Sequence, residues 1–182
     1  MAQMERKGAA MMQGNPLTLI GPELREGDEA PDFSCQDTKL NNVSLSSFKG
    51  KVKLIASVPS LDTRVCNKET IRFNDEAERM ANPDVAWIAV SMDLPFALKR
   101  FMEDEDVANM TLLSDHSKAS FGEAYGVLMK DLRLLNRAVF VLDRDDNIRY
   151  AEYLKENGEF PNFEAAVKVV RELAGGAVKA AA

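Results

Sequence analysis

The sequence is short of the residues that build disulfide scaffolds and metal sites. Its 182 residues include two cysteines, Cys35 and Cys66, and one histidine, His116. These are too few for a disulfide framework or for the four ligands of a structural zinc site. Long apolar runs are also missing, since those at residues 85–90 and 138–142 fall far short of the ~20 residues that cross a bilayer. The sequence therefore argues against a disulfide-stabilised domain, a zinc protein and a membrane protein.

Basic charge is in the minority, because 23 Lys and Arg face 29 Asp and Glu, for a formal net charge of -6. Nucleic-acid binding draws its affinity from Lys and Arg that neutralise phosphates, so we expect no nucleic-acid partner. The N-terminus lacks the apolar segment and small-residue cleavage site of a secretory signal, so we expect a cytoplasmic protein. In that reducing compartment, a cysteine that performs chemistry does so alone or as a pair.

Short apolar runs alternate with amphipathic segments, which predicts an α/β fold with a mixed central β-sheet flanked by helices and an N-terminal β-hairpin. The expected strands are residues 16–20, 33–36, 43–45, 52–57, 85–91, 110–113, 134–143 and 147–154. The first expected helix begins near Cys66, and three more cover residues 95–105, 117–125 and 162–174. We expect a single domain over residues 1–182, with a core of about residues 14–174 and flexible N- and C-terminal tails.

The first of these helices has a regular apolar face. The residues expected on that face are Cys66, Thr70, Phe73, Ala77 and Met80. Charged residues, Glu69 among them, are expected on the other sides of the helix.

The loop at residues 57–66 follows the carboxyl end of an apolar strand and leads into this helix. Open α/β sheets place their functional sites beyond the carboxyl ends of their strands. Cys66 falls in the first helical turn, where free backbone N–H groups and the helix dipole stabilise a thiolate. Thr63 is able to aim its hydroxyl at the sulfur or at a ligand, and Pro59 fixes the course of the loop. A lone cysteine at such a junction is as often a small buried apolar residue, so both interpretations stay open.

The motif Pro-x-x-x-Thr-x-x-Cys, here 59-PSLDTRVC-66, resembles the active-site motif of the peroxiredoxins, and 59-PSLDT-63 resembles their bacterial thiol peroxidase branch. Further segments resemble the same branch in the same order. These are 13-QGNPLTL-19, 93-DLPFALKRF-101, 112-LLSD-115, 124-AYGV-127 and 136-NRAVFVLD-143. The resemblance implies a thioredoxin-like fold and a thiol-dependent peroxidase that reduces hydrogen peroxide or organic hydroperoxides.

The resemblance also implies a role for each motif residue. The thiolate of Cys66 would attack a peroxide oxygen and become a sulfenic acid, Thr63 and Arg137 would hold the peroxide and stabilise charge, and Pro59 would shape the pocket. No metal, haem or flavin is implied, but a homodimer is. Independently, Arg137 adjoins an apolar run, where burial is costly unless an anion faces it; the alternative is an arginine that reaches solvent.

The sequence departs from the branch at Met102, where a resolving cysteine is usual. A thioether forms no disulfide, and Cys35, the other thiol, is expected to be buried and inert. The Cys66 sulfenic acid would then need an external thiol reductant, such as thioredoxin or a small thiol. The alternative is a peroxide sensor or redox-regulated binding protein with little turnover, to which a long-lived sulfenic acid is suited.

Three other possibilities carry less weight. Arg64, inside the motif, either points to solvent, which we expect, or further favours the thiolate. His116 lies in a polar loop and is expected at the surface. A disulfide oxidoreductase is disfavoured because the sequence has no Cys-x-x-Cys pair.

Overall fold

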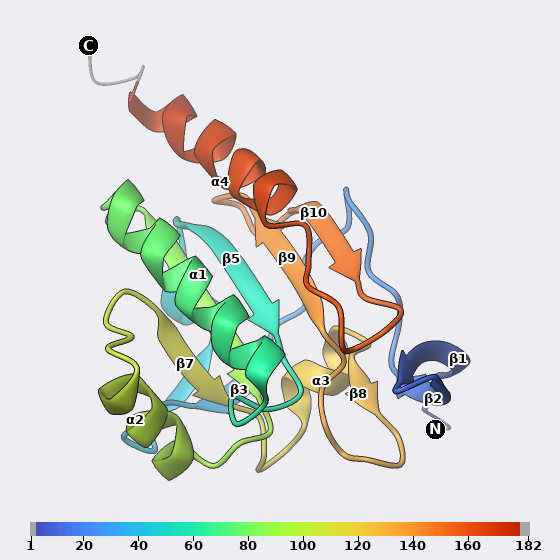
Figure 1. Ribbon diagram of the computed structural model, residues 1–182. Coiled ribbons are helices and arrows are strands. Elements are labelled where there is room, and N and C mark those ends of the chain that lie inside the picture. Colours follow the sequence, from blue (N-terminus) through green and yellow to red (C-terminus); the bar gives the residue numbers. More distant parts are fainter. Residues whose placement is uncertain (1–2, 179–182) are drawn as a thin grey trace.

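A mixed sheet forms the centre of the computed structural model, which describes residues 3–178 (Figure 1). Its seven strands have the order β10-β9-β5-β6-β7-β3-β4, with parallel pairing from β5 to β7 and antiparallel pairing elsewhere. The strands are β3 (Ser34–Gln36), β4 (Asn42–Ser44), β5 (Val52–Ser57), β6 (Val85–Ser91), β7 (Thr111–Ser114), β9 (Ala138–Leu142) and β10 (Ile148–Tyr153). The expected mixed α/β sheet is confirmed.

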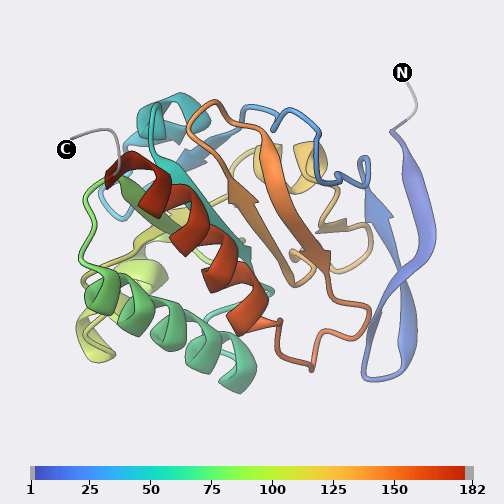
Figure 2. The same ribbon diagram turned by 90° about the horizontal axis from the view of Figure 1, so that it is seen from above.

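Helices cover both faces of this sheet. They are α1 (Arg64–Met80), α2 (Pro95–Asp104), α3 (Ser120–Ala124) and α4 (Phe163–Val178), with a short 3-10 helix, η1 (Leu45–Phe48). Leu54 of β5 faces the core under α1, α2 and α4, whereas the next residue, Ile55, faces the core that contains Phe121 of α3. Figure 2 shows α1 and α4 side by side on their face, where the rings of Phe73 and Phe163 lie 5.0 Å apart. Among the helices described, none is both long and apolar enough to span a membrane.

A second, smaller sheet consists of β1 (Glu5–Met12), β2 (Asn15–Ile20) and β8 (Leu128–Met129). The expected N-terminal hairpin is present, but its first strand occupies residues that we expected to form a flexible tail. Ala10, Leu19 and Met129 form a small buried core in this second sheet. Gly8, with φ of 65°, lies where the register of β1 shifts, and this bulge interrupts the alternation that identifies a strand. At the other end, α4 extends to Val178, and residues 179–182 of the expected C-terminal tail lie outside the described part.

Helix α1 differs from expectation on its buried face. Glu69, expected on a solvated side, is fully buried. It shares the inner face with Cys66 and Phe73, because residues three and four positions apart lie above one another on a helix. An acidic side chain therefore enters the interior one turn after the cysteine.

Candidate active site

The cysteine loop connects the carboxyl end of β5 to α1 and is held by Asp93, which follows β6. The Asp93 carboxylate accepts hydrogen bonds from the Ser60 hydroxyl at 2.7 Å and from the backbone N–H of Leu61 at 2.8 Å. Thr63 is the N-cap of α1, and its side chain accepts a bond from the backbone N–H of Cys66. The cap places the sulfur and the hydroxyl on the same first turn of the helix. Sequence reasoning missed the anchoring role of Asp93.

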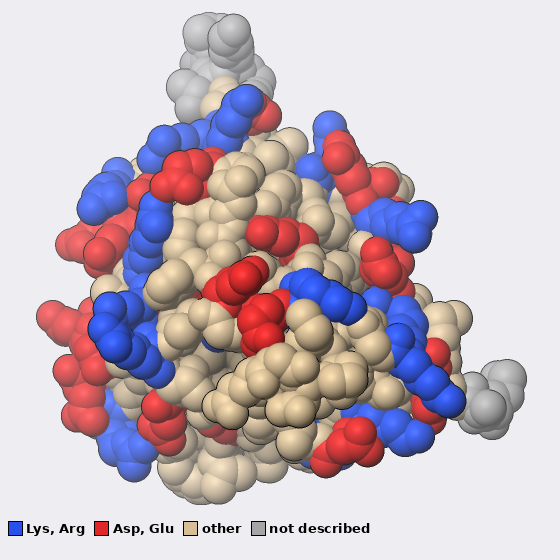
Figure 3. All heavy atoms as spheres, turned by 45° about the vertical axis from the view of Figure 1, so that its right-hand side comes forward, with Lys and Arg blue, Asp and Glu red and all other residues tan. Residues whose placement is uncertain are grey.

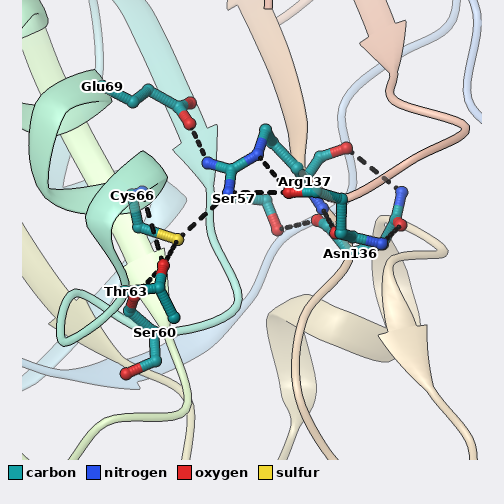
Figure 4. A network of polar contacts seen from close by, with 8 residues as sticks. Ser57, Ser60, Thr63, Cys66, Glu69, Asn136 and Arg137 are labelled. Atoms are coloured by element: carbon teal, nitrogen blue, oxygen red, sulfur yellow. Dashed lines mark hydrogen bonds and ion pairs between the residues drawn. The ribbon is translucent and has the colours of Figure 1, made fainter. Parts of the chain in front are cut away.

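Two side chains from different elements reach the sulfur of Cys66, which is fully buried (Figure 4). The Thr63 hydroxyl lies 2.7 Å from Sγ, and Nη2 of Arg137 donates to Sγ at 3.2 Å. A cationic donor and a hydroxyl donor both favour the charged form of a thiol over its neutral form. The site therefore provides what a thiolate needs in an otherwise apolar surrounding.

The Thr63 hydroxyl also lies 3.0 Å from the backbone carbonyl of Ser60. A hydroxyl carries one proton, so it donates either to this carbonyl or to the sulfur. With a neutral thiol, the Cys66 S–H donates to Thr63 and the hydroxyl turns to Ser60. With a thiolate, the hydroxyl turns to the sulfur, so the same geometry serves both protonation states.

Arg137 lies immediately before β9 and points into the interior, where it is 1% exposed. This contradicts the alternative in which its side chain reaches solvent. Nη1 forms an ion pair with Glu69, and Nε and Nη2 donate to the backbone carbonyl of Asn157 at 3.2 and 3.0 Å. The bond to Cys66 uses the second N–H of Nη2. The N–H that is left without a partner among the residues described here is therefore one on Nη1.

Glu69 is the acidic member of this cluster, and sequence reasoning did not identify it. Burial raises the pKa of its carboxyl to about 7, although the charge of Arg137 acts in the opposite direction. Its Oε1 is buried and has no hydrogen-bond partner in the described structure. The available signal was its spacing from Cys66, three residues further on the same helix face.

The raised pKa of Glu69 predicts a pH dependence of stability. This pKa lies above the unfolded value of 4.5, so between pH 4.5 and about 7 the native state binds more protons than the unfolded state. The free energy of unfolding therefore falls as pH rises through this range. The loss is about 3 kcal/mol at most. Urea unfolding across this range should show the full slope in wild type and in the control Glu164→Gln, and a clearly smaller slope in Glu69→Gln, where the raised pKa of Asp115 still contributes. An unchanged slope in Glu69→Gln would contradict the assignment.

A cavity of about 510 Å³ lies next to the cysteine loop. Pro59, Thr63 and Arg137 line it together with Met12 of β1 and with residues 156–159, which follow β10. On the face shown in Figure 3, acidic and basic side chains are interspersed. Because Thr63 and Arg137 line the cavity, it gives a small molecule access to the surroundings of these two residues.

Three of the four predicted site residues, Cys66, Thr63 and Arg137, meet in direct contact, and Pro59 lines the adjoining cavity. Of the remaining candidates, Arg64 also lines this cavity, whereas His116 is not among its lining residues. Arg64 is exposed, as expected. His116 is half-buried rather than at the surface, and its Nδ1 lies 2.8 Å from the Ser114 hydroxyl.

Cys35 lies on β3 and belongs to the core on the opposite face of the sheet from Cys66. Its thiol lies 3.5 Å from the carboxylate of Asp115, and burial, reinforced by that carboxylate, raises the pKa of Cys35 well above its ordinary range. Cys66 lies on α1, above one face of the sheet, whereas Cys35 faces the other side from β3. Strand β3 is three strand spacings, about 14 Å, from the strand that leads into the cysteine loop. A disulfide needs Cα atoms within about 7 Å, so this fold does not allow Cys35 to bridge to Cys66.

Comparison with known proteins gives the same assignment as the motif. Residues 26–151 match the AhpC/TSA family. The thiol peroxidase of Staphylococcus haemolyticus is 48% identical over 161 residues, which are 88% of this chain and 96% of that protein. The thiol peroxidase of Staphylococcus aureus is 46% identical over the same shares of both chains.

Solved structures of similar proteins give the same family assignment. The peroxiredoxin-like protein from Aquifex aeolicus superposes with a TM-score of 0.84 at 39% identity, covering 95% of this chain and 99% of that chain. The thiol peroxidase from Chromobacterium violaceum has a TM-score of 0.78 at 28% identity, covering 90% of this chain and 95% of that chain. These neighbours confirm the expected thioredoxin-like fold. The chain therefore belongs to the AhpC/TSA family, in the bacterial thiol peroxidase branch that its motif resembles.

Proposed function

We propose that this chain is a thiol-dependent peroxidase in which Cys66 is the nucleophile, Thr63 and Arg137 hold the peroxide, and Pro59 shapes the pocket. The observation that carries the proposal is the convergence on one sulfur of the Thr63 hydroxyl, at 2.7 Å, and the Arg137 guanidinium, at 3.2 Å. The thiol peroxidase names of the relatives support the same activity.

In the first half of the cycle, the Cys66 thiolate attacks the distal oxygen of a hydroperoxide. The new S–O bond takes the sulfur electron pair as the O–O bond breaks, leaving a sulfenic acid on Cys66 and an alkoxide or hydroxide that takes up a proton. Negative charge thus moves from the sulfur to the departing oxygen. Thr63 and the unpartnered N–H of Arg137 are donors for that oxygen, and such fixed donors lower the barrier most where charge develops.

In the second half, an external thiol reduces the sulfenic acid. One thiol attacks the sulfur, releases water and forms a mixed disulfide, and a second thiol frees Cys66 and leaves as a disulfide. Met102, in α2 at the place of the usual resolving cysteine, has no thiol to offer, and Cys35 lies across the sheet. We propose thioredoxin or a small thiol as the reductant for a cytoplasmic, homodimeric enzyme with one domain over residues 1–182.

Two measurements test the proposal. Reduced protein is mixed with hydrogen peroxide or an organic hydroperoxide, and Cys66 oxidation is followed by mass spectrometry with a sulfenic-acid trap. We expect oxidation of Cys66 to be orders of magnitude faster than that of a free thiol; a rate equal to the free thiol's would refute the proposal. Steady-state assays with thioredoxin, glutathione or dithiothreitol should show many turnovers, whereas one oxidation per chain would favour the peroxide sensor.

A further inference from the structure

A single loop residue, Asn157, contacts Arg137 at both its backbone and its guanidinium. The Asn157 carbonyl accepts hydrogen bonds from Nε and Nη2 of Arg137, and its side-chain Oδ1 accepts the backbone N–H of Arg137 at 2.8 Å. Asn157 is itself 4% exposed. On its other side the guanidinium meets Glu69, so its position is determined by these two residues.

The remaining polar groups of Asn157 connect it to two distant segments. Its amide nitrogen donates to Oδ1 of Asn136 at 2.8 Å and to the backbone carbonyl of Met11 at 3.1 Å, and its backbone N–H donates to the same carbonyl at 3.0 Å. Both amide protons and the amide oxygen are therefore engaged. A buried amide in this state has one orientation that satisfies all of its bonds, so it holds its neighbours in fixed positions.

Met11 belongs to the β1–β2 hairpin, which lies against the loop after β10 (Figure 2). The backbone N–H of Met11 donates to the carbonyl of Lys155 at 2.6 Å, and the Glu156 carboxylate accepts the N–H groups of Gln13 and Gly14 at 3.2 Å. The hairpin thus pairs with this loop by backbone bonds, and Asn157 carries the connection from the hairpin to Arg137.

We propose that Asn157 is a positioning residue that couples the β1–β2 hairpin to Arg137 and, through it, to the Cys66 thiolate. The proposal rests on the proposed function, because it requires Arg137 to act on the reactive sulfur. Asn157 does not contact the sulfur. Its effect follows from the placement of its carbonyl, which sets where the guanidinium lies and how well Nη2 reaches Sγ.

The first test is Asn157→Ala in a Cys35→Ser background, with Asn147→Ala as the matched control. Asn147 is also a loop asparagine, but its amide contacts Asp143. We expect the pH midpoint of Cys66 alkylation by iodoacetamide to rise by about one unit in Asn157→Ala, and the rate constant with hydrogen peroxide to fall about tenfold. The control should match the parent. An unchanged midpoint in Asn157→Ala, even with a lower melting temperature, would overturn the proposal.

The coupling to the hairpin is tested by Leu19→Ala, which opens a cavity in the small core under the hairpin. Leu45→Ala, a truncation of the same kind in η1 beyond the far edge strand β4, is the matched control. We expect Leu19→Ala to raise the alkylation midpoint in the parent but to add nothing in the Asn157→Ala background. Equal shifts in both backgrounds would show that the hairpin acts by another route and would overturn the coupling.

If Asn157→Ala does not fold, Asn136→Ala serves in its place. It removes the acceptor of the Asn157 amide and the bonds that the Asn136 amide donates to the carbonyls of Arg137 and Leu154, but it leaves every contact between Asn157 and Arg137. We therefore expect a smaller shift in the same direction, and no shift would count against the proposal. The alkylation assay uses no peroxide. A protein that fails to reduce peroxide but shows these shifts would therefore contradict the proposed function and still support the positioning role.

Discussion

Replacing Cys66 with serine is expected to reduce peroxide consumption to the rate of buffer. A serine hydroxyl stays protonated near neutral pH, and among the described residues its side-chain partners would be Thr63 and Arg137, neither of which is a general base, so it does not attack the peroxide oxygen. The expected loss is at least about a thousandfold, more than ~4 kcal/mol of activation free energy. Because serine retains a polar atom for Thr63 and Arg137, the folded structure should persist, as circular dichroism and urea unfolding would check.

The matched control is Cys35→Ser, since both cysteines are buried and free. A serine at position 35 is able to donate to Asp115 as the thiol does, so stability should change little. Peroxide consumption and the trapped sulfenic acid should remain at wild-type levels. Loss of activity in Cys35→Ser with retention in Cys66→Ser would reverse the assignment of the nucleophile.

Replacing Arg137 with methionine is expected to damage both stability and rate. It leaves Glu69 buried without its cation, and breaking a buried ion pair in this way typically costs about 3–5 kcal/mol. It also removes the guanidinium from Cys66, and loss of one such donor typically lowers a rate constant by about 10²–10³-fold. Urea unfolding above the pKa of Glu69 and stopped-flow oxidation with hydrogen peroxide measure the two effects separately.

The double variant Glu69→Met with Arg137→Met separates these effects within one protein. Replacing both members of a buried ion pair with apolar side chains of similar volume is often neutral for stability or better. We therefore expect the free energy of unfolding to return close to wild type, while the rate constant stays as low as in Arg137→Met. Recovery of the rate would show that Arg137 acts through the fold alone and not on the sulfur.

The parts of this site that were predictable from the sequence are local or belong to a family motif. Thr63 and Cys66 are three residues apart, so the N-cap of α1 alone brings them together. Arg137 is 71 residues from Cys66, and no spacing rule connects them. Its role was predicted from the resemblance of the segment 136–143, and the cost of burying an arginine supplied the independent reason.

Other parts were not predictable because their stabilising partners are distant in sequence. Glu69 was expected on a solvated face, since helical periodicity separates apolar from charged residues and does not foresee an arginine 68 residues away. Strand β1 was expected to be a tail because the first dozen residues are rich in Met, Ala and Gly, and the bulge at Gly8 leaves no regular alternation to identify a strand. Asn157 lies in a loop without a motif, and its contacts arise only once β1, β9 and β10 have assembled.

In the proposed cycle, the position of Cys35 across the sheet makes the lifetime of the oxidised enzyme depend on reactants outside the chain. No thiol of the same chain reaches the sulfenic acid of Cys66 in this cycle, so its reduction is a second-order reaction with the external thiol. Doubling the external thiol halves this lifetime, and doubling the peroxide doubles the competing conversion to sulfinic acid. The fraction of enzyme inactivated per cycle is therefore set by the ratio of two concentrations outside the protein, and the enzyme survives only where its reductant stays abundant relative to its substrate.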